Sequence, residues 1–316
     1  MKSRVVALLC LAAAACADDA QPLPDAAGSQ TGELADFRSL TMGSYAPCGG
    51  PKCGESFRLD ASGAFVHEHF EQQFEAQLAS SDLEPIVRLA SSRAVIEELR
   101  KIPGCPGVPD GGEGLVIEIA TGLFVSGDIG GCVEGPLVAL RGQLRALAKR
   151  LFPASRVTLT PVGMAPTNLE PFRLTETLKM MDFYLDRRWG PCPPMTRCLE
   201  IISVDSRLEI VSSAGVGKSR RFDHVTDFSP LDSVAISPPV VAELRKPSPC
   251  PAVTDVTETI GVWIGPRLAV RASTAGCASG PIADLRTAAR ALVDRLSADP
   301  VPDAAPADHP ADLLPP

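Results

Sequence analysis

The chain has 316 residues, of which 45% are hydrophobic, so it is long enough for about two domains with packed cores. Its net charge is −8, and its basic residues cluster no further than pairs such as Arg187-Arg188. Nucleic-acid binding needs clustered cations that displace counterions from phosphates, so the composition argues against nucleic acid as a partner.

The N-terminus has the pattern of an export signal. Two basic residues precede an apolar run from Val5 to Ala15, which is too short to cross a bilayer. The run ends in Ala13-Ala14-Ala15-Cys16, which resembles a bacterial lipobox with Ala13 in place of the usual leucine. We therefore predict a signal peptide over residues 1–15 and a palmitate-type lipid anchor on Cys16. The alternative is ordinary cleavage after Ala15 or Ala17, which leaves a soluble periplasmic or secreted protein.

Cysteine parity favours the lipidated form. Loss of Cys10 with the signal and acylation of Cys16 leave eight cysteines, an even number that can pair completely in an oxidising compartment. Residues 16–35 are rich in Ala, Asp, Gly, Gln and Pro and are expected to form a flexible tether. The expected location is the bacterial cell envelope, with the membrane as a partner through the lipid.

An internal repeat organises the rest of the chain. One offset of 145 residues maps three cysteines onto three others, Cys53, Cys105 and Cys132 onto Cys198, Cys250 and Cys277. The same offset carries Glu98–Lys101 onto Glu243–Lys246, whereas Cys48 and Cys192 are displaced by one residue. We predict two tandem copies of one small domain, over residues 36–152 and 173–297. A linker at 153–172 joins them, and a disordered tail follows at 298–316.

Each copy is predicted to be α+β. In the first copy, strands over 55–60 and 64–70 flank a turn at Ala61-Ser62-Gly63. A short helix over 93–101 follows Ser92, which is a suitable N-cap, and Ser237-Pro238 begins the matching helix of the second copy. Two more strands follow in each copy, at 115–120 and 123–126 and at 260–264 and 268–271.

A long amphipathic helix closes each copy. The helix that begins at Pro136 carries one apolar stripe of Leu137, Leu140, Leu144, Leu147 and Leu151, with Arg141, Arg145 and Arg150 off the stripe. The second copy has the matching stripe of Ile282, Leu285, Ala289, Leu292 and Leu296. We therefore expect, in each copy, an antiparallel sheet packed against its own C-terminal amphipathic helix. The alternative is a helix face that also binds a partner.

Four cysteines in each copy allow either two disulfides or one tetrahedral zinc site. Zinc sites favour two close cysteine pairs, whereas only Cys48 and Cys53 are close here, and an exported protein meets an oxidising compartment. We therefore predict disulfides. Of the three possible connectivities we favour Cys105–Cys132, because a hairpin between these residues brings its ends together, and this leaves Cys48–Cys53. The equivalent pairs in the second copy are Cys250–Cys277 and Cys192–Cys198.

His67 and His69 form a weak candidate metal site, because residues two apart on a strand point to the same side. The second copy has Ser212-Ser213-Ala214 at this place, and no third ligand is identifiable, so we interpret the pair as part of a solvated strand face. No hydrolase, transferase or phosphate-binding motif occurs, and no cofactor is expected.

The first strand pair carries a family resemblance. The stretch Cys48-x(4)-Cys53-x(3)-Phe57-x-Leu59-Asp60-x-x-Gly63-x-Phe65-Val66 resembles a domain of unknown function in bacterial envelope proteins. The resemblance covers a minor part of each copy. It implies a small α+β envelope domain and brings no known activity.

The two copies share cysteines, glycines, prolines and core aliphatics and differ at nearly all candidate catalytic positions. We therefore expect an exported, lipid-anchored envelope protein with a non-catalytic binding or structural role, whose partner is an envelope protein or a glycan. The alternative is a cell-envelope enzyme whose active site matches no known motif.

Overall fold

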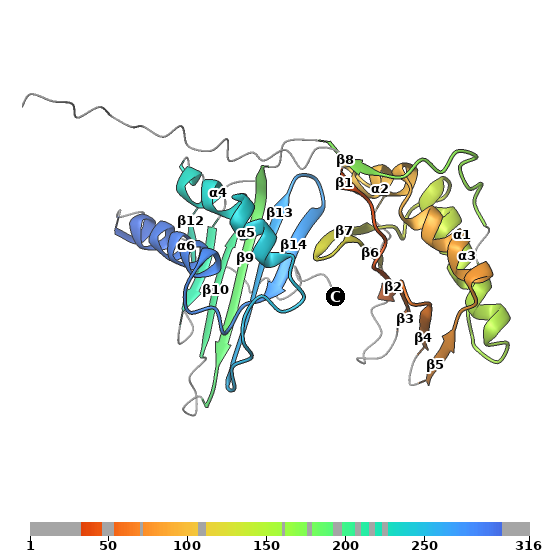
Figure 1. The fold of residues 1–316 in the computed structure, drawn as a ribbon, viewed down its shortest axis with the longest axis horizontal. Helices are drawn as coiled ribbons and strands as arrows, with labels where there is room; N and C mark the ends of the chain where they lie inside the picture. The colour runs from red at the N-terminus through yellow and green to blue at the C-terminus, as the bar shows by residue number, and fades with distance from the viewer. Residues whose placement is uncertain are drawn as a thin grey trace, which may run out of the picture.

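A computed structural model describes residues 33–45, 54–69, 72–106, 112–159, 162–175, 179–191, 198–205, 210–214, 219–222 and 227–298. The expected signal peptide, most of the tether and nearly all of the expected tail lie outside these ranges, as do Cys10, Cys16, Cys48, Cys53 and Cys192. The described part is α+β and has fourteen strands and six helices (Figure 1). Among the described residues, no helix is both long and apolar enough to cross a membrane.

The strands and helices alternate in two similar series along the chain. The strands are β1 (Glu33–Leu34), β2 (Ser39–Tyr45), β3 (Glu55–Asp60), β4 (Ala64–His69), β5 (Gln72–Gln77), β6 (Gly112–Ala120), β7 (Leu123–Asp128), β8 (Arg173–Leu174), β9 (Met180–Trp189), β10 (Leu199–Val204), β11 (Ile210–Ala214), β12 (Ser219–Phe222), β13 (Val256–Ile264) and β14 (Leu268–Ser273). The helices are α1 (Ser80–Ala90), α2 (Arg93–Arg100), α3 (Pro136–Leu151), α4 (Ser229–Ala235), α5 (Pro238–Leu244) and α6 (Pro281–Ala298).

Twelve of the described strands form one antiparallel sheet, in the order β12-β11-β10-β9-β13-β14-β7-β6-β2-β3-β4-β5. This sheet consists of two sets of six strands, which meet where β7 pairs with β14. We call the elements from β2 to α3 the N-half and those from β9 to α6 the C-half. Counted outward from β7 and β14, both sets have the same strand order. β1 and β8 pair with each other outside this sheet.

The strand registers in the two halves also correspond. In the N-half, Ile117 of β6 lies opposite Val125 of β7, and in the C-half Val262 of β13 lies opposite Val270 of β14. Both residues of the second pair stand 145 positions after those of the first. The offset that relates the cysteines therefore also relates the hydrogen-bonded ladders.

The hydrophobic core lies on one face of the sheet, under the helices. The apolar stripe of α3 is buried, with Leu140 and Leu144 fully so, and Leu285 and Ala289 of α6 are buried in the same way. At the junction, Leu123 of β7 pairs with Val270 of β14, and both side chains are buried. The cores of the two halves therefore lie on the same face of the sheet.

Several elements differ from the sequence-based expectation. Strands β2, β5, β9 and β12 and helices α1 and α4 were not predicted. Helix α1 contains Pro85, which normally argues against a helix, and β2 contains Gly43, which weakens a strand pattern. Ser92 does cap α2, since its side chain accepts a hydrogen bond from the Val95 amide. Ser237 precedes α5 without a side-chain cap bond, and its hydroxyl donates to the carbonyl of Val234.

Candidate functional site

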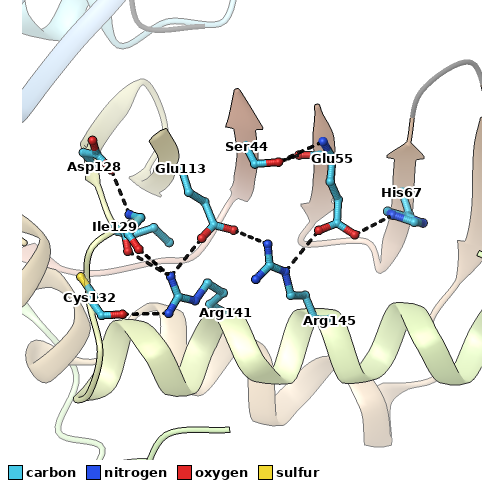
Figure 2. A network of polar contacts seen from close by, with 10 residues as sticks. Ser44, Glu55, His67, Glu113, Asp128, Ile129, Cys132, Arg141 and Arg145 are labelled. Atoms are coloured by element: carbon cyan, nitrogen blue, oxygen red, sulfur yellow. Dashed lines mark hydrogen bonds and ion pairs between the residues drawn. The ribbon is translucent and has the colours of Figure 1, made fainter. Parts of the chain in front are cut away.

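A network of charged side chains lies between α3 and the sheet in the N-half (Figure 2). Glu55 begins β3 and Glu113 lies in β6, both on the face of the sheet that carries the core. Arg141 and Arg145 stand one helical turn apart on α3, so both project toward these strands. Glu113 is 6% exposed and Arg141 is 8% exposed. Both arginines were expected off the buried stripe, and this expectation is wrong, since each is 8% exposed.

Each charge in the network has an opposite charge as its partner. Arg141 Nη1 donates to Glu113 Oε2 at 3.0 Å, and Arg145 Nη2 donates to Glu113 Oε1 at 2.9 Å. Arg145 Nε also donates to Glu55 Oε2 at 3.2 Å. Glu113 therefore bridges the two arginines, and Arg145 bridges the two glutamates (Figure 2). Burial of ions is costly unless they are paired, and here two positive charges balance two negative ones.

The same network fixes the loop that precedes α3. Arg141 Nη2 donates to the carbonyl of Cys132 at 2.8 Å, and Nη1 donates to the carbonyl of Ile129 at 3.1 Å (Figure 2). The Ile129 amide in turn donates to the backbone carbonyl of Glu113. One buried guanidinium therefore ties together the start of β6, the loop after β7 and the helix.

His67 extends the network at its other end. Its Nε2 lies 3.2 Å from Glu55 Oε1, and the side chain is fully buried. The imidazole stacks on Phe57 at a centroid distance of 4.8 Å and lies 5.8 Å from Phe74. The expectation of a solvated strand face is therefore wrong for His67. Its neighbour Phe65, two residues earlier on β4, is also buried, and alternation puts both on the helix-covered face.

His69 lies beside His67, the other candidate metal ligand of the sequence. The ring centroids of the two histidines are 6.3 Å apart, but Nε2 of His67 faces Glu55. Burial lowers the pKa of His69, while the nearby charge of Glu55 opposes this effect. Within the described ranges, no three His, Cys, Asp or Glu side chains gather in a way that would hold a metal ion.

The C-half contains the counterpart of the network. The four residues that stand 145 positions after Glu55, Glu113, Arg141 and Arg145 are Glu200, Glu258, Arg286 and Arg290. Arg286 Nε donates to Glu258 Oε2 at 3.0 Å, and Arg290 Nε donates to Glu200 Oε1 at 2.7 Å. Arg286 Nη1 donates to the carbonyl of Cys277 at 3.0 Å, as Arg141 does to that of Cys132.

The C-half network differs in its details. Glu258 is 1% exposed and accepts a hydrogen bond from the Thr274 hydroxyl at 2.6 Å. Arg187 of β9 approaches Glu258 Oε2 at 3.6 Å, so this carboxylate has a second cation nearby. The strand position that corresponds to His67 is Ser212. The glutamate–arginine pairs are thus common to both halves, whereas a serine stands at the strand position that corresponds to the buried His67.

Sequence reasoning missed these glutamate–arginine pairs, although the signal was present. The offset of 145 that aligns the cysteines also aligns Glu with Glu and Arg with Arg at all four positions. The repeated charges do not by themselves distinguish buried from exposed positions, since Lys101 and its counterpart Lys246 are both exposed.

Two disulfides close the loops beside the networks, Cys105–Cys132 and Cys250–Cys277, each with a Cα–Cα distance of 5.0 Å. These are the pairings that the sequence favours. Cys198 is also disulfide-bonded. The glycine before the second cysteine of each pair is required sterically. A Cβ on Gly131 would overlap the Pro106 carbonyl, and one on Gly276 would overlap the Pro251 carbonyl.

The two hollows found among the described residues lie away from the networks. A shallow hollow of about 330 Å³ lies beside the Cys250–Cys277 disulfide, and another of about 290 Å³ lies on β4 and β5. Neither is lined by a glutamate or arginine of the two networks. Each carboxylate of the two networks is paired with a guanidinium group of α3 or α6, and these pairs hold helix to sheet. No protein-family profile matches the chain, and no curated protein matches it.

Proposed function

We propose that the protein is an exported, lipid-anchored component of the bacterial envelope with a non-catalytic binding or structural role. In this proposal Cys16 carries the lipid, and the mature chain consists of two copies of one disulfide-stapled α+β domain, residues 36–152 and 173–297. Each copy packs its sheet against its C-terminal helix. The lipid holds the protein at the membrane, where it meets an envelope protein or a glycan.

One observation carries the non-catalytic part of the proposal. The charged residues that the two networks share are paired with one another, as in the contact of Arg145 with Glu113, and all of them are buried except Glu200 and Arg290, which are half-buried. A general acid or base must reach the proton that it transfers, at hydrogen-bond distance from a substrate. Groups that are enclosed between a helix and a sheet meet no substrate. The charged residues at the duplicated positions therefore stabilise the packing of the helix on the sheet.

The disulfides support the assignment to an oxidising compartment. Cys105–Cys132 and Cys250–Cys277 occupy corresponding places in the two halves. Structural disulfides form and persist in secreted and envelope proteins and are rare in the reducing cytosol. Together with the N-terminal signal pattern, they favour export.

The duplication is supported by agreement at several levels. The two halves have the same strand order, and their helix-to-sheet ion pairs join residues at the same sequence separations. Arg141 and Glu113 are 28 residues apart, as are Arg286 and Glu258, and the pairs Arg145–Glu55 and Arg290–Glu200 both span 90. Independent evolution of two unrelated domains would not reproduce such separations.

The experiment is the intact mass of the mature protein from its native host, measured with and without thiol alkylation under non-reducing conditions. We expect the mass of a chain that begins at Cys16 and carries acyl groups, with no mass added by alkylation. A Cys16→Ser variant, which is the matched control, is expected to lose the acyl mass and leave the membrane fraction. Free thiols in the wild-type protein, or an unmodified N-terminus, would contradict the proposal.

A further inference from the structure

The junction of the two halves has local two-fold symmetry. Three residue pairs join β7 to β14, namely Leu123–Val270, Phe124–Ala269 and Val125–Leu268. Adding 145 to Leu123 gives Leu268, and adding 145 to Val125 gives Val270. The two outer pairs therefore correspond to each other under the offset. It maps Phe124 onto its own partner, Ala269. The halves therefore meet as the two subunits of a symmetric dimer meet, through the same edge of each.

Side-chain contacts across the junction follow the same symmetry. Arg100 of the N-half donates from Nε to the carbonyl of Pro266 in the C-half at 3.1 Å. Arg245 of the C-half donates from Nε to the carbonyl of Thr121 in the N-half at 3.0 Å. Arg245 is the counterpart of Arg100, and Pro266 is the counterpart of Thr121. Through these two hydrogen bonds, one arginine of each half contacts the backbone of the other half.

Arg267 breaks this symmetry. It precedes β14 in the C-half, and its guanidinium enters the N-half, where Nη1 donates to the carbonyl of Leu99 at 3.3 Å. It fits there because two neighbouring residues lack side chains. A Cβ on Gly104 would lie 2.7 Å from Arg267 Nη2, and a Cβ on Gly127 would overlap Nη1. The N-half therefore presents a recess, and the C-half presents the side chain that fills it.

The equivalent recess and projection are missing on the other side. The residues of the C-half that correspond to Gly104 and Gly127 are Pro249 and Ala272, and the residue of the N-half that corresponds to Arg267 is Gly122. Gly122 lies against the backbone of Arg245, so that a Cβ at this position would overlap the Arg245 Cα. Only a glycine is accommodated there.

These differences decide which halves can pair. In a pair of two C-halves, Arg267 would stand where Gly122 now stands, against the backbone of the other Arg245, and its guanidinium would meet Pro249 and Ala272. In a pair of two N-halves both recesses would be empty, and Phe124 would face a second Phe124. The pair of one N-half with one C-half satisfies every contact, because a small residue lies opposite each large one.

We infer that the β7–β14 junction is a heterotypic protein–protein interface built into one chain, and that a second copy of this chain can supply the complementary half. Such a dimer forms by reciprocal exchange, so that each N-half pairs with the C-half of the other chain. The contacts between halves of two different chains are the same as those between the halves of one chain. The monomer is therefore favoured only because the linker keeps its own two halves at a high effective concentration. The inference does not depend on the compartment.

The test uses the full mature chain with a site for a sequence-specific protease inserted after Thr175, an exposed residue between β8 and β9. After cleavage, β8 remains with the N-half through its pairing with β1. Two cleaved samples, one of them isotope-labelled, are mixed and analysed by native mass spectrometry. We expect the fragments to remain associated and to form mixed complexes of one N-half with one C-half from different chains.

Two variants make the test specific to the interface. Arg267→Ala removes the projecting side chain and is expected to weaken the complex of the cleaved fragments about tenfold or more. The matched control is Arg271→Ala on β14, which is exposed and lies beyond the three junction pairs, and which should change the affinity less than about twofold. Folded fragments that separate at micromolar concentration, or complexes of two C-halves, would overturn the inference.

A second measurement uses the uncut chain, so that the inference stays testable if cleaved fragments aggregate. Chains with Phe124→Cys and chains with Ala269→Cys are mixed at rising concentration with a short bifunctional thiol crosslinker. Because residues 124 and 269 lie opposite each other, exchange should produce covalent dimers in the mixture. Ala269→Cys by itself should produce none. Dimers that form from Ala269→Cys as readily as from the mixture, or no dimers in the mixture, would refute the exchange.

Discussion

Phe124 of β7 lies directly opposite Ala269 of β14, the residue that stands 145 positions later in the chain. In the pairing of two identical edges, the residue on the symmetry axis faces a copy of itself. Here the two corresponding positions carry one large and one small side chain. The junction thus has the geometry of a symmetric pair and the complementarity of an asymmetric one.

The buried network predicts a large difference between two arginines of the same helix. Arg145→Ala leaves the carboxylates of Glu55 and Glu113 without one of their cations, and should lower the free energy of unfolding by about 3–5 kcal/mol. Arg150→Ala is the control, because the side chain of Arg150 is 60% exposed in its contact with Asp82, and should cost less than about 1 kcal/mol. Urea denaturation followed by circular dichroism measures both. Equal losses would mean that the network contributes no more than a surface pair.

The turn between β3 and β4 predicts a pH-dependent effect. Asp60 Oδ1 accepts hydrogen bonds from the Ser62 hydroxyl and from the amides of Ser62 and Ala64. These bonds, that of the Ser62 hydroxyl first, lower the pKa of Asp60. A carboxyl whose pKa is lowered by folding contributes stability that is present above its unfolded pKa and is lost as the pH falls through the folded value.

Asp60→Ala should therefore destabilise the protein at pH 7 and have a smaller effect at pH 3, as measured by urea midpoints at the two values. Asp60→Asn is the control, because it keeps an acceptor oxygen but cannot titrate. The idea fails if the difference between wild type and Asp60→Ala is the same at both pH values.

The loop that carries the first disulfide predicts a steric requirement for glycine. Gly131→Ala places a methyl group against the Pro106 carbonyl, which lies next to Cys105. Because this backbone must then shift, the substitution should cost about 1–3 kcal/mol of unfolding free energy. It should also slow the formation of the Cys105–Cys132 bond after reduction, as followed by alkylation and mass mapping.

Gly114→Ala serves as the comparison, since a Cβ there meets nothing within 4 Å and this backbone is not left-handed. The two variants share the loss of a glycine and differ only in the neighbouring atoms. If Gly114→Ala impairs disulfide formation as much as Gly131→Ala does, the proposed overlap with the Pro106 carbonyl is not the cause.

A comparison of alanine variants at Gly122 and Gly280 distinguishes the effect of backbone strain from the effect of contact between the halves. Gly122 and Gly280 both have positive φ angles, of 68° and 83°, so alanine is strained at either position and should cost about 1–3 kcal/mol. Only a Cβ on Gly122 meets the other half, at the backbone of Arg245, whereas one on Gly280 meets nothing within 4 Å. Gly122→Ala should therefore also weaken the association of the cleaved halves, and Gly280→Ala should not. Similar affinities of the two variants, measured by native mass spectrometry, would contradict this role of Gly122.

Some features of the site could be predicted from the sequence because they depend on local pattern. Cys105 and Cys132 flank a hairpin, and the ends of a hairpin lie close together by construction, so their pairing could be anticipated. Burial of His67 could also have been predicted. It stands two residues after Phe65 on an alternating strand, and both side chains point to the covered face.

Burial of Arg141 could not be predicted from helical periodicity, since periodicity sorts residues by polarity and counts arginine as a surface residue. Its partner Glu113 is 28 residues away in the chain and belongs to a strand. The ion pair with Glu113 offsets the cost of burying the Arg141 charge. Glu113 lies next to the helix only when the sheet has formed.

The amino-acid sequence alone is therefore sufficient to find the period of 145 and the apolar stripes and to predict the bonds Cys105–Cys132 and Cys250–Cys277, because each of these is a relation between residue types at fixed spacing. Only the tertiary structure places β7 beside β14. That pairing is made by backbone hydrogen bonds, which every residue except proline can form, and so it leaves little trace in the sequence. The residues that make it selective, Arg267 in one half and Gly127 in the other, become a pair only when the two edges meet.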